Sequence, residues 1–435
     1  MNEYKNANAV PAHRRWTVRT AAVAVTAVTA AVTAAVTASG AYAATTSTTR
    51  AGTATSHATE LARLAGRDVA AGAPGVIVRV DDGRGPVIRV ARQTPWSRSD
   101  HRLSATDEFR MGSNTKTMVA TVVLQLVAEH RVRLSDPVET WLPGLVPDGR
   151  AITVRMLLNH TSGLFNYTND PDVLKAFTGQ DTRTWTPPQL LAAAVRHPSL
   201  FAPGTGYSYS NTNYIALGLI AEKATGRGLG ELVHQRIAKP LHLIHTRLVT
   251  GTPRPGDKRL ANGYEPDAAH LAPVLPPGTP AGTAFAGPAR PGGHVNTTWI
   301  NLSTEWAAGG IVSTADEWAR FDTALMSGKL LPPAQLKQMK TTVSEGSGTA
   351  NRYGLGLEQV TTPCGTVWGH DGQVPGYSSE DYTDATGHRT VSVFTSTIFG
   401  LANARTGTAD QALINASICA MLGKPAPAGT SAAGA

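Results

Sequence analysis

The sequence is poor in several residue types and motifs that would otherwise place it in a functional class. Its 435 residues include two cysteines, 16% charged residues and 6% aromatic residues. With so few soft ligands, and with no carboxylates at zinc-like spacing around His242 and His245, we predict no metal and no other cofactor. The chain also lacks the Gly-x-Ser-x-Gly nucleophile elbow, which excludes an α/β-hydrolase.

A concentrated basic surface is missing as well, although the net charge is +8. Part of this charge lies before residue 44, and the other lysines and arginines are scattered instead of clustered with aromatic residues. Proteins that bind nucleic acids carry a basic patch or stripe on one face. We therefore predict no nucleic-acid partner.

Long hydrophobic runs are absent except near the N-terminus. Arg14, Arg15 and Arg19 precede an Ala-, Val- and Thr-rich stretch over residues 21–38, which is followed by Ala41-Tyr42-Ala43. This order is typical of a secretory signal peptide, and the stretch is too short and too rich in threonine for a permanent membrane span. We predict a secreted protein with a signal peptide over residues 1–43, cleaved near Ala43, and no stable membrane span after processing.

Export would give the two cysteines a role. Cys364 lies on the predicted strand that leads into the His370 motif, and Cys419 lies on a predicted C-terminal helix with Leu413 and Ile418. In an oxidising compartment two such cysteines are expected to pair. The predicted disulfide would tie the last helix to that strand.

Ser113 and Lys116 form the most informative motif. The residues after them have apolar side chains at helical spacing, so Ser113 lies at the first turn of a predicted helix. Side chains three residues apart project from one helix face, and a lysine whose pKa is lowered by burial can take the proton of a serine hydroxyl. Free backbone N–H groups at a helix start also favour the negative charge of an attacked carbonyl oxygen. The geometry suits acyl transfer.

Two further strings follow in a fixed order. Tyr209-Ser-Asn211 lies on a Gly- and Pro-bounded loop before another apolar helix, where functional side chains collect. His370-Asp-Gly372 lies at the end of a predicted strand. Each string is common by chance, with a capping asparagine or a structural histidine as the alternative.

Together these strings resemble the serine penicillin-recognising enzymes, in the branch of the class C β-lactamases and the secreted D-alanyl-D-alanine carboxypeptidases. The resemblance spans nearly all of the mature chain. It also includes the segments FRMGSNTK, ITVRMLLNHTSGLFNYTND, APGTGYSYSNTNYIALGLIAEKATG, AAGGIVST and YGLGLE.

The resemblance implies a role for each matched residue. Ser113 would be the acylated nucleophile, Lys116 and Tyr209 would shuttle its proton, and Asn211 would hold the substrate amide. Which of Lys116 and Tyr209 is the base stays open. His370 would be the basic residue of the third motif, Gly372 would complete that motif, and the backbone N–H groups of Ser113 and Gln373 would form the oxyanion hole. Trp306 is predicted either to line the cleft or to be a core residue.

Two departures from the family pattern affect the substrate. Asp371 stands where the carboxypeptidases have a threonine that helps to hold the substrate carboxylate, and Glu358 stands where an arginine is expected. A fixed carboxylate opposes docking of a free D-Ala carboxylate unless Arg352 or His370 compensates. Strand alternation leaves an alternative in which Asp371 points away from the cleft.

The predicted function is therefore a secreted serine hydrolase with a covalent acyl-enzyme, D-alanyl-D-alanine carboxypeptidase-like on cell-wall peptides. A D-amino-acid peptidase or amidase, an esterase and a class C-type β-lactamase remain alternatives, and a non-catalytic binder of wall fragments is a remote one. The predicted partners are peptide or ester substrates, including peptidoglycan stem peptides. β-Lactams are expected as covalent inhibitors or substrates.

The predicted fold belongs to the α/β class, β-lactamase/transpeptidase-like, with an antiparallel sheet flanked by helices and an inserted all-helical subdomain. A disordered linker over residues 44–56 and a disordered tail over residues 423–435 flank a catalytic domain over residues 57–422. Its α/β part covers residues 57–118 and 305–422, and its helical part covers residues 119–304 with a Pro- and Gly-rich loop at 266–293. Strands are expected at 76–80, 87–91, 353–360, 366–370, 377–383 and 391–395.

Overall fold

A computed structural model of the chain describes residues 45–253, 258–275, 279–347 and 349–427. The predicted signal peptide, with its cleavage site near Ala43, lies outside these residues, and so do residues 428–435 of the predicted tail. None of the helices in the described ranges is long and apolar enough to cross a membrane.

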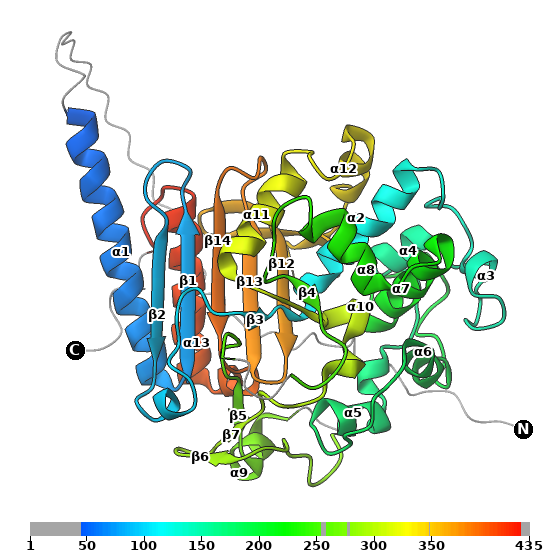
Figure 1. Cartoon of the computed structure of the whole chain (residues 1–435), viewed down its shortest axis with the longest axis horizontal. Helices are drawn as coiled ribbons and strands as arrows, with labels where there is room; N and C mark the ends of the chain where they lie inside the picture. The colour runs from blue at the N-terminus through cyan, green and yellow to red at the C-terminus, as the bar shows by residue number, and fades with distance from the viewer. Residues whose placement is uncertain (1–44, 254–257, 276–278, 348, 428–435) are drawn as a thin grey trace, which may run out of the picture.

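An antiparallel sheet of eight strands forms one half of the molecule (Figure 1). Both ends of the chain contribute strands, because β1 pairs with β14 over Val76↔Thr395 to Asp81↔Thr390. In spatial order the strands are β2 (Ile88–Gln93), β1 (Gly75–Asp81), β14 (Thr390–Thr395), β13 (Tyr377–Thr383), β12 (Gly365–Val374), β11 (Glu358–Thr362), β10 (Arg352–Tyr353) and β9 (Val343–Ser344).

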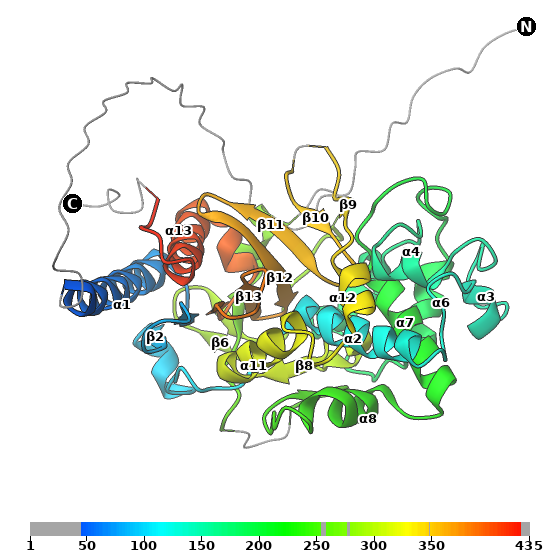
Figure 2. The same ribbon diagram turned by 90° about the horizontal axis from the view of Figure 1, so that it is seen from above.

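Two long helices cover one face of this sheet, α1 (Thr45–Ala71) and α13 (Ala404–Met421). They lie side by side against the strands in both views (Figures 1 and 2). Leu61 and Leu64 of α1 share a buried cluster with Val78 of β1 and Leu413 of α13. Alternate residues of the strands therefore face these two helices, and the residues between them face the rest of the molecule.

The opposite face of the sheet packs against α2 and α11, beyond which the other helices form the second half (Figure 2). A single large core joins both halves, with Phe394 of β14, Val119 of α2 and Leu217 of α7 among its members. The helices on this side are α2 (Thr115–Ala128), α3 (Val138–Trp141), α4 (Val154–Leu158), α5 (Pro171–Phe177), α6 (Pro187–Val195), α7 (Asn211–Thr225), α8 (Leu229–Val233), α10 (Trp306–Gly309), α11 (Ala315–Met326) and α12 (Pro333–Met339).

Two small sheets complete the fold. One orders β3 (Phe109–Arg110), β8 (Ile311–Ser313) and β4 (Arg247–Leu248), and it leads the chain into the Ser113 segment. The other orders β5 (Tyr264–Pro266), β7 (His294–Asn296) and β6 (Ala289–Arg290), next to α9 (Ala268–Leu271). The segment at 266–293, predicted as a patternless loop, thus contains α9 and β6. It packs on a small core of its own, which includes Leu271, Phe285 and Phe399.

The predicted fold class is confirmed, since antiparallel sheets and helices make up the described chain in the expected arrangement. Besides the loop at 266–293, two further local predictions are wrong. The linker at 44–56 is helical from Thr45, and the strand predicted at 353–360 is broken into β10 and β11 by a tight turn.

The disulfide between Cys364 and Cys419 is also confirmed, with a Cα–Cα distance of 5.3 Å. Cys364 lies in the turn between β11 and β12, and Cys419 lies on α13. The bond therefore links α13 to the strand that carries the third motif, as expected.

Candidate active site

Ser113 lies on a 3-10 turn, η2 (Gly112–Asn114), that enters α2. The turn presses directly on β12. Gly112 has φ +49°, and a Cβ atom on it would collide with the backbone nitrogen of Gln373. A Cβ atom on Gly372 would collide in the same way with the carbonyl oxygen of Met111. Only glycine allows this approach at both positions, and it brings Ser113 next to the backbone of the third motif.

Lys116 is completely buried one turn further along, and its Nζ has three acceptors. It lies 2.8 Å from Ser113 Oγ, 2.7 Å from Asn211 Oδ1 and 2.7 Å from the carbonyl oxygen of Ala308. These partners come from η2, α7 and α10, so that three separate elements hold the amine. The predicted contact between Ser113 and Lys116 is therefore present.

Tyr209 places its ring between Lys116 and the third motif. Lys116 Nζ lies 4.9 Å from the Tyr209 ring centroid, and the rings of Tyr209 and His370 are 6.2 Å apart. A second histidine, His160, lies 4.3 Å from the Tyr209 ring. Its Nδ1 accepts from the backbone N–H of Ser210 at 3.2 Å and lies 3.0 Å from Asn213 Nδ2. Sequence reasoning missed His160, although it lies in the quoted segment LLNHTSG.

Asn211 begins α7 beside Ser113. Its side-chain oxygen accepts from Lys116, and its backbone N–H donates to Asn166 Oδ1 at 3.0 Å. With its oxygen committed to Lys116, the NH2 group of Asn211 is the part that can donate to another molecule. Asn211 is partly exposed, as are Ser113, Tyr209 and Gln373, whereas Lys116 and His370 are buried behind them. A substrate can therefore contact these four residues.

His370 is held in place from both sides of its ring. Its Nε2 lies 2.8 Å from the hydroxyl oxygen of Tyr353, and its Nδ1 is hydrogen-bonded to the carbonyl oxygen of Asp371. Glu358 Oε1 lies 3.7 Å from Nε2, and Asp371 Oδ1 lies 3.5 Å from Nδ1. Glu358, His370 and Asp371 offer metal-ligand atoms near one another. However, the two carboxylates face different ring nitrogens, each already hydrogen-bonded, so they do not converge on one lone pair.

Asp371 points away from Ser113, which corrects its prediction as a substrate-binding residue. It is paired directly with Glu380, and Glu380 is paired with Val393, which packs under α1 and α13. Residues of the opposite parity face the serine: Ser379 Oγ donates to the carbonyl oxygen of Met111. Burial and the charge of Asp371 raise the pKa of Glu380 well above its ordinary value, which fits two carboxyl groups on one covered face.

Three further residues lie where they do not contact a substrate at Ser113. Glu358 is 2% exposed and lies beside His370, inside the protein. Trp306 is a core residue, with its ring over Gly218 of α7. Arg352 is exposed on β10, the second strand from the edge of the sheet, and its Nε donates to Thr342 Oγ1 at 2.8 Å. Glu358 was predicted to bind the substrate, Trp306 was predicted either to line the cleft or to be a core residue, and Arg352 was considered as a compensating cation.

Glu305 is a site residue that sequence reasoning missed. It precedes α10 and is buried, and burial raises the pKa of its carboxyl to about 7 while Lys116 and Arg110 oppose this rise. Nothing in the pattern around it marks it, because the surrounding segment NLSTEWAAGG resembles an ordinary helix start.

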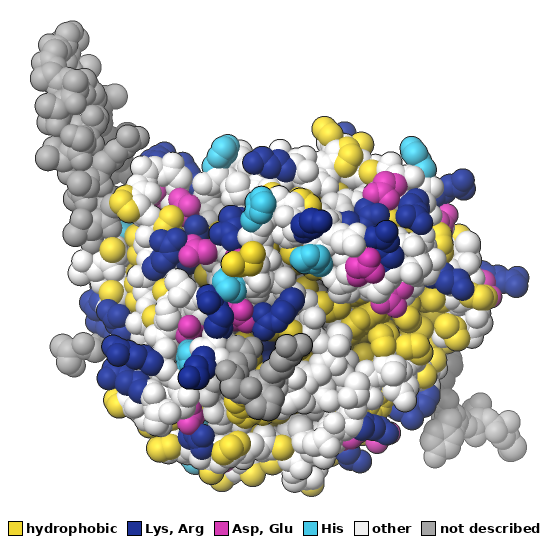
Figure 3. Space-filling model, in the orientation of Figure 1, with side chains coloured by type: hydrophobic (Ala, Val, Ile, Leu, Met, Phe, Trp, Pro, Cys, Tyr) yellow, Lys and Arg dark blue, Asp and Glu magenta, His cyan; other side chains and the backbone are white. Residues whose placement is uncertain are grey.

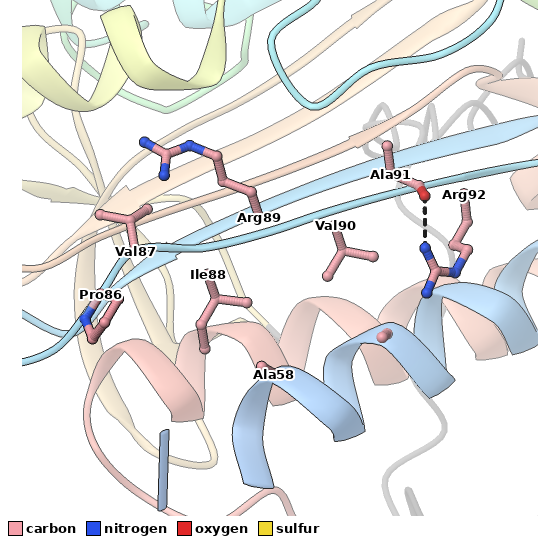
Figure 4. A pocket seen from close by; sticks show the side chains of 9 residues that line it. Ala58, Pro86, Val87, Ile88, Arg89, Val90, Ala91 and Arg92 are labelled. Carbon is pink, nitrogen blue, oxygen red and sulfur yellow. Dashed lines mark hydrogen bonds between the residues drawn. The ribbon is translucent and has the colours of Figure 1, made fainter. Parts of the chain in front are cut away.

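The surface divides by residue type. Lysine and arginine side chains are spread over the face shown in Figure 3, while hydrophobic side chains gather near α10 and α6. A separate hollow lies between α1 and β2, with Ala58 on one wall and Ile88 and Val90 pointing into it (Figure 4). It contains none of the predicted site residues.

Comparisons with known proteins agree with this geometry. The family model named Beta-lactamase matches residues 61–416. Penicillin-binding protein 4* of Bacillus subtilis is 27% identical over 62% of this chain, but the match covers only 56% of that relative's length. Among solved structures, a D-stereospecific amidohydrolase from Streptomyces sp. is 34% identical, with a TM-score of 0.69, over 83% of this chain and 98% of its own. The D-amino acid amidase from Ochrobactrum anthropi SV3 is 25% identical, with a TM-score of 0.70, over 81% of this chain and 97% of its own.

Proposed function

Since this chain belongs to the β-lactamase family of serine hydrolases, we propose that it hydrolyses amides and short peptides of D-amino acids through an acyl-enzyme on Ser113. The observation that carries the proposal is the buried Lys116 Nζ, 2.8 Å from Ser113 Oγ, in a cluster that also contains Tyr209 and Asn211. A serine hydroxyl needs such a neighbour to lose its proton at neutral pH.

Acylation follows from the positions of these groups. Ser113 Oγ attacks the substrate carbonyl carbon while its proton passes to the pair formed by Lys116 and Tyr209. The carbonyl π electrons move to the oxygen, which lies between the backbone N–H groups of Ser113 and Gln373. When the C–N bond breaks, the nitrogen takes the proton and leaves as the amine. Water then attacks the ester and releases the acid.

The edge of β12 offers a place for the substrate backbone. The pairing of β11 with β12 ends at Glu358↔Gly369, so the segment from His370 to Val374 is not covered by β11. An extended substrate can pair with this edge, as peptides do when they add a strand to a sheet. Asn211 Nδ2 can then donate to the substrate amide from the other side of Ser113.

The substrate class follows from the groups around the third motif. Glu358 lies 3.7 Å from His370 Nε2, so that its carboxylate offsets the positive charge that a free terminal carboxylate would need. Arg352 is bound to Thr342 at the outer edge of the sheet. An amide or amine leaving group carries no negative charge and meets no such penalty. The likeness to the D-stereospecific amidohydrolase and the D-amino acid amidase also supports this class.

A D-alanyl-D-alanine carboxypeptidase is the second candidate. The penicillin-binding relative favours it, and a protonated His370 would be the cation for the terminal carboxylate. Against it stands the position of His370, which is completely buried, with Tyr353 and the two carboxylates around its ring.

Time-resolved mass spectrometry of the intact protein tests both candidates. The substrates are D-phenylalanine amide, its L-enantiomer, a D-Ala-D-Ala peptide with a free carboxylate and a fluorescent penicillin. We expect hydrolysis of the D-amide, little of the L-amide, and a penicillin adduct on Ser113. Ser113→Ala should abolish turnover and adduct, and Ser99→Ala, on the exposed surface, should change neither. Faster cleavage of the D-Ala-D-Ala peptide would favour the carboxypeptidase, and hydrolysis by Ser113→Ala would refute the mechanism.

We further propose that the enzyme acts outside the cytoplasm. The signal-like sequence up to Ala43 and the disulfide between Cys364 and Cys419 support export. Mass spectrometry of culture medium tests this: a mature N-terminus near residue 44 is expected, and intact Met1 on protein found only inside cells would contradict it.

A further inference from the structure

Glu305 lies inside the protein at the start of α10, the helix whose Ala308 carbonyl oxygen accepts from the candidate catalytic lysine. It is 5% exposed and immediately precedes α10, and its carboxylate folds back over that helix, so that a Cβ atom on Gly309 would collide with Oε2. Its other oxygen, Oε1, makes no hydrogen bond of normal geometry among the described residues, and the nearby Thr304 side chain only partly lowers the pKa of the carboxyl. A buried carboxylate with an unpartnered oxygen is costly unless a nearby charge compensates it.

The compensating charges are two cations. Lys116 and Arg110 both act on the Glu305 carboxylate, and Ala308, three residues after Glu305, gives its carbonyl oxygen to Lys116 Nζ at 2.7 Å. Arg110 is fully buried, and two of its nitrogens, Nε and Nη1, lack acceptors among the described residues. The negative charge of Glu305 therefore compensates part of the positive charge of both buried cations.

The hydrogen bonds alone do not show whether Lys116 is a charged ammonium or a neutral amine. An ammonium would donate to Ser113 Oγ, Asn211 Oδ1 and the Ala308 carbonyl oxygen, one proton to each. A neutral amine would donate to the last two and accept from Ser113. An ionised Glu305 favours the first arrangement, because an opposite charge stabilises the ammonium. The rings of Tyr209 and Tyr214, 4.9 and 5.6 Å from Nζ, favour it too.

We propose that Glu305 is a positioning residue that supplies the buried counter-charge for the Lys116 ammonium. This inference rests on the proposed acyl-enzyme function and deepens it by naming the state of the lysine. Since an ammonium has no lone pair, Tyr209 is the base in its phenolate form, and the Ser113 proton passes to the phenolate oxygen as the Oγ–C bond forms. Tyr209 returns it to the departing nitrogen.

The charged and titratable groups around this cluster come from several elements. Lys116 is on α2, and Arg110 is on β3. Tyr209 lies just before α7, and Tyr214 lies in its first turn. Tyr167, whose hydroxyl donates to the Thr304 carbonyl oxygen, lies behind, and burial together with the Glu305 charge raises its pKa. The Tyr377 ring lies 5.2 Å from Arg110. Of these groups, Glu305 is the acidic side chain that acts on Lys116.

The test is the pH profile of kcat/KM for Glu305→Gln, which keeps the shape and removes the charge. The matched control is Asp322→Asn, another buried acid, which lies on α11 near Arg79. Loss of a negative charge makes both Lys116 and Tyr209 give up their protons more easily. We therefore expect both limbs of the profile to move to lower pH by about one unit. The control should move neither. A profile with unmoved limbs and only a lower maximum would overturn the proposal.

A second measurement tests the proposal even if Glu305→Gln is inactive. Selective 13C labelling of the lysine side chains allows Lys116 to be titrated by NMR, with Lys116→Arg used to assign its signal. A lower titration midpoint in Glu305→Gln supports the proposal, and an unchanged midpoint overturns it. This readout needs no turnover. If the wild-type enzyme forms no adduct on Ser113, the proposed function fails, while the titration still decides the role of Glu305.

Discussion

Replacing Asp371 by asparagine should stabilise the protein and leave its substrate preference unchanged. Asp371 and Glu380 are directly opposed on β12 and β13, and directly opposed residues have Cβ atoms about 5 Å apart. Two ionised carboxylates at this distance repel by about 3 kcal/mol at an effective dielectric constant near 20. The Asp371 side chain is 25% exposed, and Glu380 can avoid the repulsion by keeping its proton. We expect a gain in unfolding free energy of about 1–2 kcal/mol at pH 8.

The sign of the pH dependence follows from Glu380. Burial and the Asp371 charge raise its folded pKa above 4.5, the ordinary value, so it binds a proton more tightly in the folded state. Its contribution to stability is complete below that value and is lost as the pH rises through the folded pKa. Removing the Asp371 charge lowers the folded pKa and reduces this loss. The advantage of Asp371→Asn should therefore be absent at pH 4 and grow with rising pH.

Urea unfolding at pH 4, 6 and 8, followed by tryptophan fluorescence, measures this advantage. Asp172→Asn, a substitution of an exposed aspartate on α5, is the control and should change the unfolding free energy by less than about 0.5 kcal/mol. In parallel, Asp371→Thr should not speed cleavage of a D-Ala-D-Ala peptide. A tenfold gain in that cleavage, or equal stability at all three pH values, would show that Asp371 faces the cleft and would refute the assignment of its strand face.

Three other predictions concern the frame of the site. Burial beside Asp410 raises the pKa of Asp68 to about 9, so the unfolding free energy should fall as the pH rises from about 4 to 9. Asp68→Asn should flatten this decline and raise the Tm at pH 8, which calorimetry measures. Replacing Cys364 and Cys419 by serine opens a 55-residue loop and should cost about 4 kcal/mol in urea unfolding, with no change if the bond does not form in the native protein. Gly112→Ala should lower kcat/KM at least 100-fold with little change in the circular dichroism spectrum, because its Cβ pushes Ser113 away from β12; normal turnover would contradict this contact.

Sequence alone located the site well where chemistry and local spacing coincide. The contact between Ser113 and Lys116 follows from helical spacing, and the disulfide was expected from two cysteines in a chain whose N-terminal sequence resembles a signal peptide. Strand parity did not settle Asp371, because the register of β12 depends on its partners β11 and β13. Glu305 could not be found either, since its role depends on α10 folding back beside α2, almost 190 residues away in the chain. A tertiary contact of this kind has no local signal.

The contact between η2 and β12 explains why short strings far apart in the chain carry so much information. Gly112 and Gly372 meet there without side chains, so the backbone of the third motif lies against the turn that holds Ser113. Any larger residue at either position would separate the nucleophile from the N–H group of Gln373, and a shift of about 1 Å in such a geometry can cost about 100-fold in rate. The glycines are therefore required by the reaction geometry as strictly as Ser113 is by the chemistry. The residues between the strings need only fold into a core that keeps η2 and β12 in contact.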